Sequence, residues 1–94
     1  MRVRFSKLAL AELDIILDEI RANNPAAASG FEQRVRRVIE RIAQYPEGAQ
    51  RVEQRQSVRR VPLVRYPYVI HYTIVEADVM ILRIIHGARR SPWE

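Results

Sequence analysis

The sequence predicts an α+β fold: an N-terminal strand, an antiparallel hairpin of two helices, and a three-stranded antiparallel meander, with the helices packed on one sheet face. Two long segments of helical periodicity come first and three short apolar runs follow, which is the element order of an α+β domain. The chain has 94 residues, of which 48% are hydrophobic, so it has room for one modest core. We therefore expect a single domain over residues 1–94.

The first elements are a short strand and an amphipathic helix. Val3 and Phe5 alternate with arginines, as in a strand with one buried face. Ser6 can cap a helix over residues 7–22, because its hydroxyl can accept a hydrogen bond from a free backbone N–H of the first turn. Apolar residues recur along this helix at three- and four-residue steps and are expected to face the core: Leu10, Leu13, Ile16, Leu17 and Ile20.

A second helix follows almost at once. Pro25 disfavours helical geometry in the residue before it, and Asn24 is a suitable cap, so the new helix begins at Pro25 and runs to about Tyr45. Its apolar stripe consists of Ala28, Phe31, Val35, Val38, Ile39 and Ile42. Because the link between the helices is so short, they must lie side by side as a hairpin that needs a sheet to cover.

The sheet is predicted from three runs with strand character, at residues 57–63, 69–75 and 79–86. In the middle run Ile70, Tyr72 and Ile74 share one face, which we expect to contact the helices, whereas His71 lies on the opposite, polar face. The last run is apolar on both faces, as in a central strand. The polar segment 47–56 is predicted to be a mobile loop.

Composition excludes several classes of protein. The chain has no cysteine, so it has no disulfide, thiolate metal site or cysteine nucleophile, and we expect no metal and no cofactor. No apolar segment is long enough for a membrane span or a signal peptide, which predicts a soluble cytoplasmic protein without a membrane partner. The net charge of +5 suits an acidic partner, either a protein or a nucleic acid. A plain nucleic-acid-binding module ranks last, because no helix has the exposed recognition face of a helix-turn-helix reader.

Short motifs spread over nearly the whole chain resemble those of the ParE toxins in the RelE/ParE superfamily, the toxic half of bacterial type II toxin–antitoxin modules. The motifs occur in this order: Phe5-Ser6, Ala11-Glu12-Leu13, Asn24-Pro25-Ala26-Ala27, Tyr45-Pro46-Glu47-Gly48, Arg59-Arg60-Val61, Tyr66-Pro67-Tyr68-Val69-Ile70-His71-Tyr72 and Ile81-Leu82-Arg83-Ile84-Ile85-His86-Gly87-Ala88-Arg89-Arg90. The resemblance implies the strand, helix, helix and meander order predicted above.

The resemblance to ParE implies a toxin that binds and blocks DNA gyrase and thereby stops replication. The RelE branch instead cleaves mRNA on the ribosome, with Lys and Arg residues and a C-terminal Tyr or a His/Glu set. Here Val69 stands where RelE-like chains carry a catalytic Arg, and no Tyr follows Arg89. We therefore expect a non-enzymatic inhibitor with no catalytic residue. The alternative is a RelE-like mRNA endoribonuclease that uses Arg59, Arg89 and His86 in a modified arrangement.

The C-terminal residues are the predicted contacts with the target, because Trp and Arg are the residues most enriched in interface hot spots. This set comprises Arg83, His86, Arg89, Arg90 and Trp93. Two of its members have a structural alternative. His86 could be a partly buried residue at a strand end with its ring hydrogen-bonded to backbone, and Trp93 could fold back over the apolar outer face of the last strand.

The resemblance also implies a cognate ParD-like antitoxin whose acidic C-terminal segment folds on the toxin to form a hetero-oligomer. Apolar positions on the first helix and arginines on the second could receive an amphipathic acidic helix. The expected contacts are Leu8, Ile15, Leu17, Arg34, Arg37 and Arg41.

Overall fold

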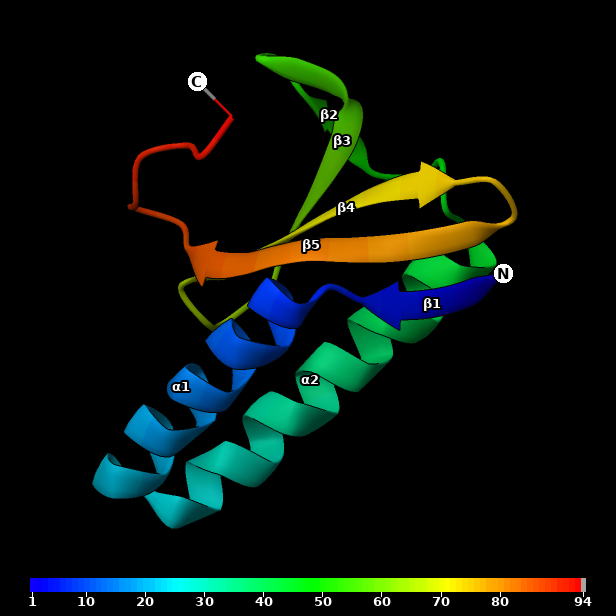
Figure 1. Ribbon diagram of the computed structural model, residues 1–94. Coiled ribbons are helices and arrows are strands. Elements are labelled where there is room, and N and C mark those ends of the chain that lie inside the picture. The colour runs from blue at the N-terminus through cyan, green and yellow to red at the C-terminus, as the bar shows by residue number, and fades with distance from the viewer. Residues whose placement is uncertain (94) are drawn as a thin grey trace.

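Two helices lie on one side of a five-stranded sheet in the computed structural model, which describes residues 1–93 (Figure 1). The elements in chain order are β1 (Arg2–Phe5), α1 (Lys7–Asn23), α2 (Pro25–Gln44), β2 (Gln50–Val52), β3 (Arg55–Pro62), β4 (Tyr68–Val75) and β5 (Asp78–His86). The predicted α+β class is confirmed. Glu94, the last residue of the predicted domain, lies outside the described residues.

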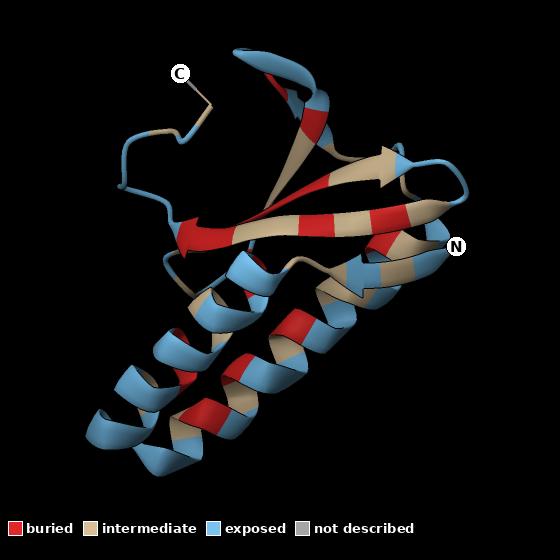
Figure 2. Ribbon diagram, viewed as in Figure 1, coloured by how far each residue is buried: buried red, intermediate tan, exposed pale blue. Residues whose placement is uncertain are grey.

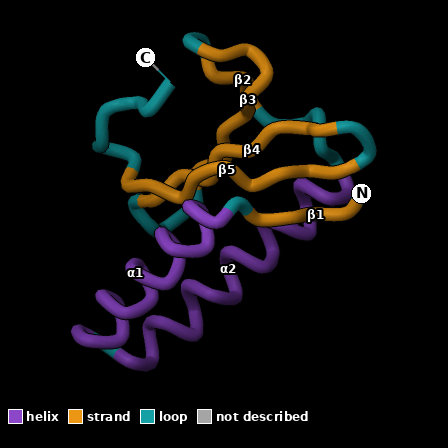
Figure 3. The backbone as a smooth tube through the Cα atoms, in the orientation of Figure 1, coloured by secondary structure: helices purple, strands orange, loops and turns teal. Residues whose placement is uncertain are grey.

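The two helices form the predicted antiparallel hairpin (Figure 3). Both predicted caps are present: the Ser6 hydroxyl accepts a hydrogen bond from the Ala9 N–H at 3.0 Å, and the Asn24 side chain accepts one from the Ala26 N–H at 3.2 Å. These bonds satisfy backbone donors that a helix leaves free in its first turn. Within residues 1–93 neither helix combines the length and apolar character needed to cross a bilayer.

The sheet has the strand order β1-β5-β4-β3-β2, in which β1 is parallel to β5 and the other pairs are antiparallel. The predicted three-stranded meander was therefore one strand short. The missing strand, β2, lies in the segment that we expected to be a mobile loop, and it pairs Gln50 with Arg60 of β3. Its three residues are mostly polar, so their strand conformation depends on this pairing rather than on a local pattern.

A β-bulge in β5 changes which residues face the helices. His71 pairs with Arg83 and Tyr72 with Ile81, so Leu82 has no partner on β4. The Ser6 hydroxyl donates to the Leu82 carbonyl at 2.9 Å, which ties the start of α1 to the bulge. The extra residue lets Ile81 and Ile84 both enter the core, although they are three positions apart and strict alternation would place them on opposite faces.

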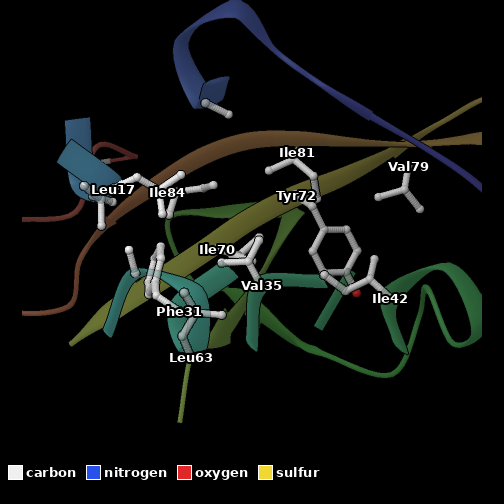
Figure 4. Packing of buried hydrophobic residues seen from close by; sticks show 13 residues of the cluster. Leu17, Phe31, Val35, Ile42, Leu63, Ile70, Tyr72, Val79, Ile81 and Ile84 are labelled. Carbon is white, nitrogen blue, oxygen red and sulfur yellow. The ribbon is translucent and has the colours of Figure 1, made fainter. Parts of the chain in front are cut away.

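The core fills the space between the helix hairpin and the sheet (Figure 4). Phe31 of α2 is fully buried and meets the rings of Tyr66 and Tyr68 edge to face, with centroid distances of 5.2 and 5.7 Å. Tyr72 is also fully buried, and its hydroxyl donates to the Pro46 carbonyl at 2.6 Å. Leu10 was expected to face the core but is 48% exposed. The face of α1 that contacts the core is narrower than the set of apolar residues along this helix.

An ion pair joins α1 to β5. Arg83 Nη2 donates to Glu12 Oε2 at 2.8 Å, and Arg83 Nε lies 3.1 Å from both carboxylate oxygens. The Ile84 N–H also donates to Glu12 Oε1, at 3.1 Å. The two side chains are 17% and 12% exposed, so this pair is largely shielded from water.

Candidate functional site

The sheet face opposite the helices, which we call the outer face, is partly covered by the C-terminal tail. After β5 the tail turns away from the helices and runs toward the β2–β3 hairpin (Figure 1). A second set of apolar residues is buried without belonging to the helix-side core: Val52, Val58, Val69 and Ile85. Most tail residues are exposed, and the half-buried ones come at its end (Figure 2).

Trp93 folds back onto the outer face. Its ring meets that of His71 edge to face, with centroids 5.8 Å apart and an interplanar angle of 90°. The guanidinium carbon of Arg55 lies 5.6 Å from the centre of the indole ring. Trp93 is therefore folded back onto the sheet, as its structural alternative predicted, but its contacts are with β4 and β3 and not with the last strand. Arg55, which sequence reasoning missed, is its second neighbour.

The Trp93 contact leaves two polar atoms without a hydrogen-bond partner: His71 Nδ1 and Trp93 Nε1 are both buried and unpaired. Each such group costs about 1–3 kcal/mol. An edge-to-face ring pair contributes about 0.5–1.5 kcal/mol, and a cation over an aromatic ring at an exposed site about 0.5–1 kcal/mol. The favourable and unfavourable contributions are therefore of similar size.

His71 is buried, with only 6% of its residue surface exposed, although its alternation in β4 predicted a polar face. Burial, together with the positive charges of Arg60 and Arg83, lowers its pKa from 6.5 to about 4, while Glu12 acts in the opposite direction. The ring is therefore neutral at neutral pH. The sequence pattern of β4 could not show that the tail would cover this face.

Between the tail and the β2–β3 hairpin lies a cavity of about 310 Å³. We call it the outer cavity. The polar residues along its wall include Arg51, Arg60, His71, His86, Arg89 and Ser91, and its apolar floor includes Val69 and Ile85. Three guanidinium groups against the single carboxylate of Glu53 make its lining basic, so it suits an anionic group of a partner.

The predicted target contacts are only partly brought together. His86 and Arg89 line the outer cavity, and Arg90 is exposed beside them, whereas Trp93 is seated on the sheet. The His86 ring accepts a hydrogen bond from the Ala88 N–H at 3.1 Å, as its structural alternative required, but the residue is exposed rather than partly buried. Arg83 is engaged by Glu12, a partner 71 positions away that no local pattern shows.

The residues proposed for RNA cleavage do not form one cluster. Arg59 donates to the carbonyls of Glu47 and Ala49 at 3.0 and 2.7 Å, which ties it to the loop before β2. His86 and Arg89 share the outer cavity, but the buried Val69 occupies its floor where RelE-like chains carry an arginine.

The predicted antitoxin contacts lie on different sides of the helix hairpin. Leu17 lines an apolar groove of about 280 Å³ between α1, α2 and β1, which we call the helix groove; its other lining residues are Phe5, Leu13, Glu32, Val35, Arg36, Ile39 and Glu40. Ile15 is 57% exposed on another side of α1, beside Ile85 and Arg89. Arg41 lies near Tyr45 at a third depression. Leu8 is 51% exposed, Arg34 is half-buried and Arg37 is exposed. One straight helix cannot contact all of them.

Known proteins similar to this chain are toxins. Residues 3–91 match the family described as ParE toxin of type II toxin-antitoxin system, parDE. Toxin RelE2 of Caulobacter vibrioides is 37% identical over 86% of this chain and 89% of its own length. Y4kP of Sinorhizobium fredii, named as a candidate toxin, is 33% identical over 97% of this chain and 93% of its own.

A solved structure has the same fold. It is the chromosomal ParDE TA system from P. aeruginosa, which superposes with a TM-score of 0.80 at 26% identity and covers 92% of this chain and 95% of that chain. The family match spans almost all of the described residues, including α1, α2, the sheet and most of the tail. This chain belongs to the ParE toxin family of type II toxin–antitoxin systems.

Proposed function

We propose that this toxin blocks DNA gyrase by direct binding and uses its C-terminal tail as the contact surface. The contact residues are His86, Arg89, Arg90 and Trp93. Arg83, which the sequence also suggested, is left out because its guanidinium is bound to Glu12. Since gyrase acts on chromosomal DNA, the proposal requires a protein of the bacterial cytoplasm.

The observation that supports this proposal most is the position of the basic tail in a chain of this family. Arg89 and Arg90 are exposed immediately beyond β5, the strand that pairs with both β1 and β4. Two arginines therefore follow a strand that is hydrogen-bonded on both sides, so a partner can bind them without any change in the sheet. Such charges favour fast association with an acidic protein surface.

The test is a gyrase supercoiling assay with antitoxin-free protein. We expect the wild type to block supercoiling. The double variant Arg89→Gln/Arg90→Gln should reach the same inhibition only at a protein concentration at least about tenfold higher. Arg34→Gln/Arg37→Gln is the matched control, because it removes two positive charges from α2. It should inhibit as the wild type does.

Two results would argue against the proposal. If both double variants lost inhibition of supercoiling to the same extent, the net charge of the protein alone would explain the inhibition. Normal supercoiling in the presence of the wild-type protein would exclude gyrase as the target.

A second candidate, ribosome-dependent mRNA cleavage, is favoured by the similarity to toxin RelE2 and by the shared position of His86 and Arg89 at the outer cavity. Against it, His71 Nδ1 is buried, Arg59 is tied to the loop before β2, and one nitrogen of the His86 ring already accepts a hydrogen bond from the Ala88 N–H. Cleavage of mRNA in a translation reaction would occur only under this alternative.

We also propose that a ParD-like antitoxin binds in the helix groove through an amphipathic, acidic segment that folds on binding. The groove offers apolar walls from Phe5, Leu13 and Val35, with Leu17 at its base, so it can receive the apolar face of a helix. Arg36 lines the same groove and can pair with a carboxylate of the incoming helix. This assignment keeps Leu17 as a contact and replaces the arginines first expected on α2.

Charge reversal at neighbouring positions tests the groove. Arg36→Glu should weaken antitoxin binding by about tenfold, because it places a third acidic residue beside Glu32 and Glu40. Arg37→Glu carries the same charge change about 100° further round the helix and should have little effect. Isothermal titration calorimetry measures both. If Arg37→Glu weakened antitoxin binding more than Arg36→Glu, the contact would instead involve the arginines predicted from the sequence.

A further inference from the structure

The C-terminal tail is held to the outer face through a side chain with unmet hydrogen bonds. Trp93 contacts His71 and Arg55, yet its Nε1 and the Nδ1 of His71 are both buried without a partner. Both atoms would gain water if the indole left this position. The closed position is therefore favoured by ring contacts and opposed by hydrogen bonding.

Beyond β5 the tail has backbone bonds that do not depend on the Trp93 position. The Gly87 N–H donates to the Pro67 carbonyl at 2.7 Å, which fixes the base of the tail. The N–H groups of Ala88 and Arg89 donate to His86, and that of Trp93 to Ser91 at 3.3 Å. These last three bonds are local, so they can persist when the tail moves as a unit.

Moving the tail would change the surface available to a partner. Gly87, Arg89 and Ser91 help to enclose the outer cavity, whose floor includes Val69 and Ile85. Displacement of the tail would uncover this floor and free the indole. An indole beside Arg55 and in the same tail as Arg89 combines the residue types most enriched in interface hot spots.

We propose that residues 87–93 form a latch, closed when Trp93 sits between His71 and Arg55, and that the target-binding surface is complete only when the latch opens. The existence of the latch is independent of the target's identity. Its role in binding rests on the proposed function, because gyrase is the partner used to measure it.

Trp93 is the only tryptophan, so its fluorescence reports the latch directly. The experiment measures acrylamide quenching of the folded, full-length protein for the wild type, Arg55→Gln and Arg41→Gln. Arg55→Gln removes the cation over the indole and should raise the population of open latch about two- to fivefold, seen as stronger quenching. Arg41→Gln is the matched control, because it removes a cation 5.9 Å from the Tyr45 ring instead, and it should match the wild type.

The same three proteins are then compared in the supercoiling assay. We expect Arg55→Gln to inhibit at a lower concentration than the wild type, since less binding free energy is spent on opening. Weaker inhibition by Arg55→Gln would overturn the proposed role, because Arg55 would then be a contact in the closed form.

The quenching data alone decide whether the latch exists. Wild-type quenching as strong as that of the urea-unfolded chain, or no change in Arg55→Gln, would exclude it. If quenching follows the expectation but no protein inhibits gyrase, the latch stands and the proposed target is wrong.

Discussion

Replacing Arg83 by Met is expected to lower the free energy of unfolding by about 3–5 kcal/mol, because it leaves the carboxylate of Glu12 buried without its cation. The Glu12 side chain is only 12% exposed, so water cannot replace the three close contacts that Arg83 makes with it. Met keeps much of the apolar stem of Arg83, so the change tests the charge more than the packing. Urea unfolding followed by far-UV circular dichroism measures the loss.

Two further variants separate the buried pair from ordinary surface charge. Glu12→Met/Arg83→Met removes both charges and should be much closer to the wild type than Arg83→Met, since no unpaired charge remains. Arg21→Met breaks contacts with Asp18 and Glu32, in which the Arg21 side chain is 51% exposed, and should cost less than about 1 kcal/mol. A loss from Arg83→Met no larger than that from Arg21→Met would contradict this account.

Acidification is expected to destabilise the fold through His71. Burial, together with the positive charges of Arg60 and Arg83, lowers the pKa of this residue from 6.5 to about 4 in the folded state, while Glu12 acts in the opposite direction. Between these two values the unfolded chain binds a proton that the folded chain does not, so stability falls as the pH falls. The free energy of unfolding that depends on a neutral His71 is fully present above about pH 6.5 and is lost as the pH falls toward 4. This loss amounts to about 3 kcal/mol.

The measurement is the free energy of unfolding in urea at several pH values between 7 and 4. For His71→Gln the free energy of unfolding should fall less with decreasing pH than for the wild type. The glutamine that replaces His71 cannot take up a proton on unfolding. His86→Gln removes the exposed histidine and serves as the matched control. Parallel curves for His71→Gln and the wild type would show that His71 does not carry the effect.

The helices could be predicted from the sequence almost to the residue, because their signals are local. Ser6 and Asn24 supply side-chain acceptors at the points where α1 and α2 begin, and Pro25 separates the two. The faces of β4 were also predictable, since alternation places Ile70 and Tyr72 together in the core. Each of these inferences uses residues only a few positions apart.

The features that the sequence did not predict depend on distant partners. β2 is held by β3, and the bulge at Leu82 breaks the alternation on which a face assignment relies. His71 is buried and meets Trp93 of the returning tail, and Arg83 is paired with a glutamate on the first helix. The sequence predicted that the candidate site lies in the C-terminal tail. The arrangement of the site could not be predicted, because it depends on these contacts between remote segments.

The parallel pairing of β1 with β5 also has a consequence for how the toxin is synthesised. Residues at the two ends of the chain meet there: Phe5 pairs with Ile81, and Ser6 bonds to Leu82 across 76 positions. Such non-local pairing is entropically costly and slow, and it cannot begin until β5 has been translated. The first strand must therefore wait unpaired until the last strand has been made, and the basic tail gains its folded base only when β5 joins the sheet.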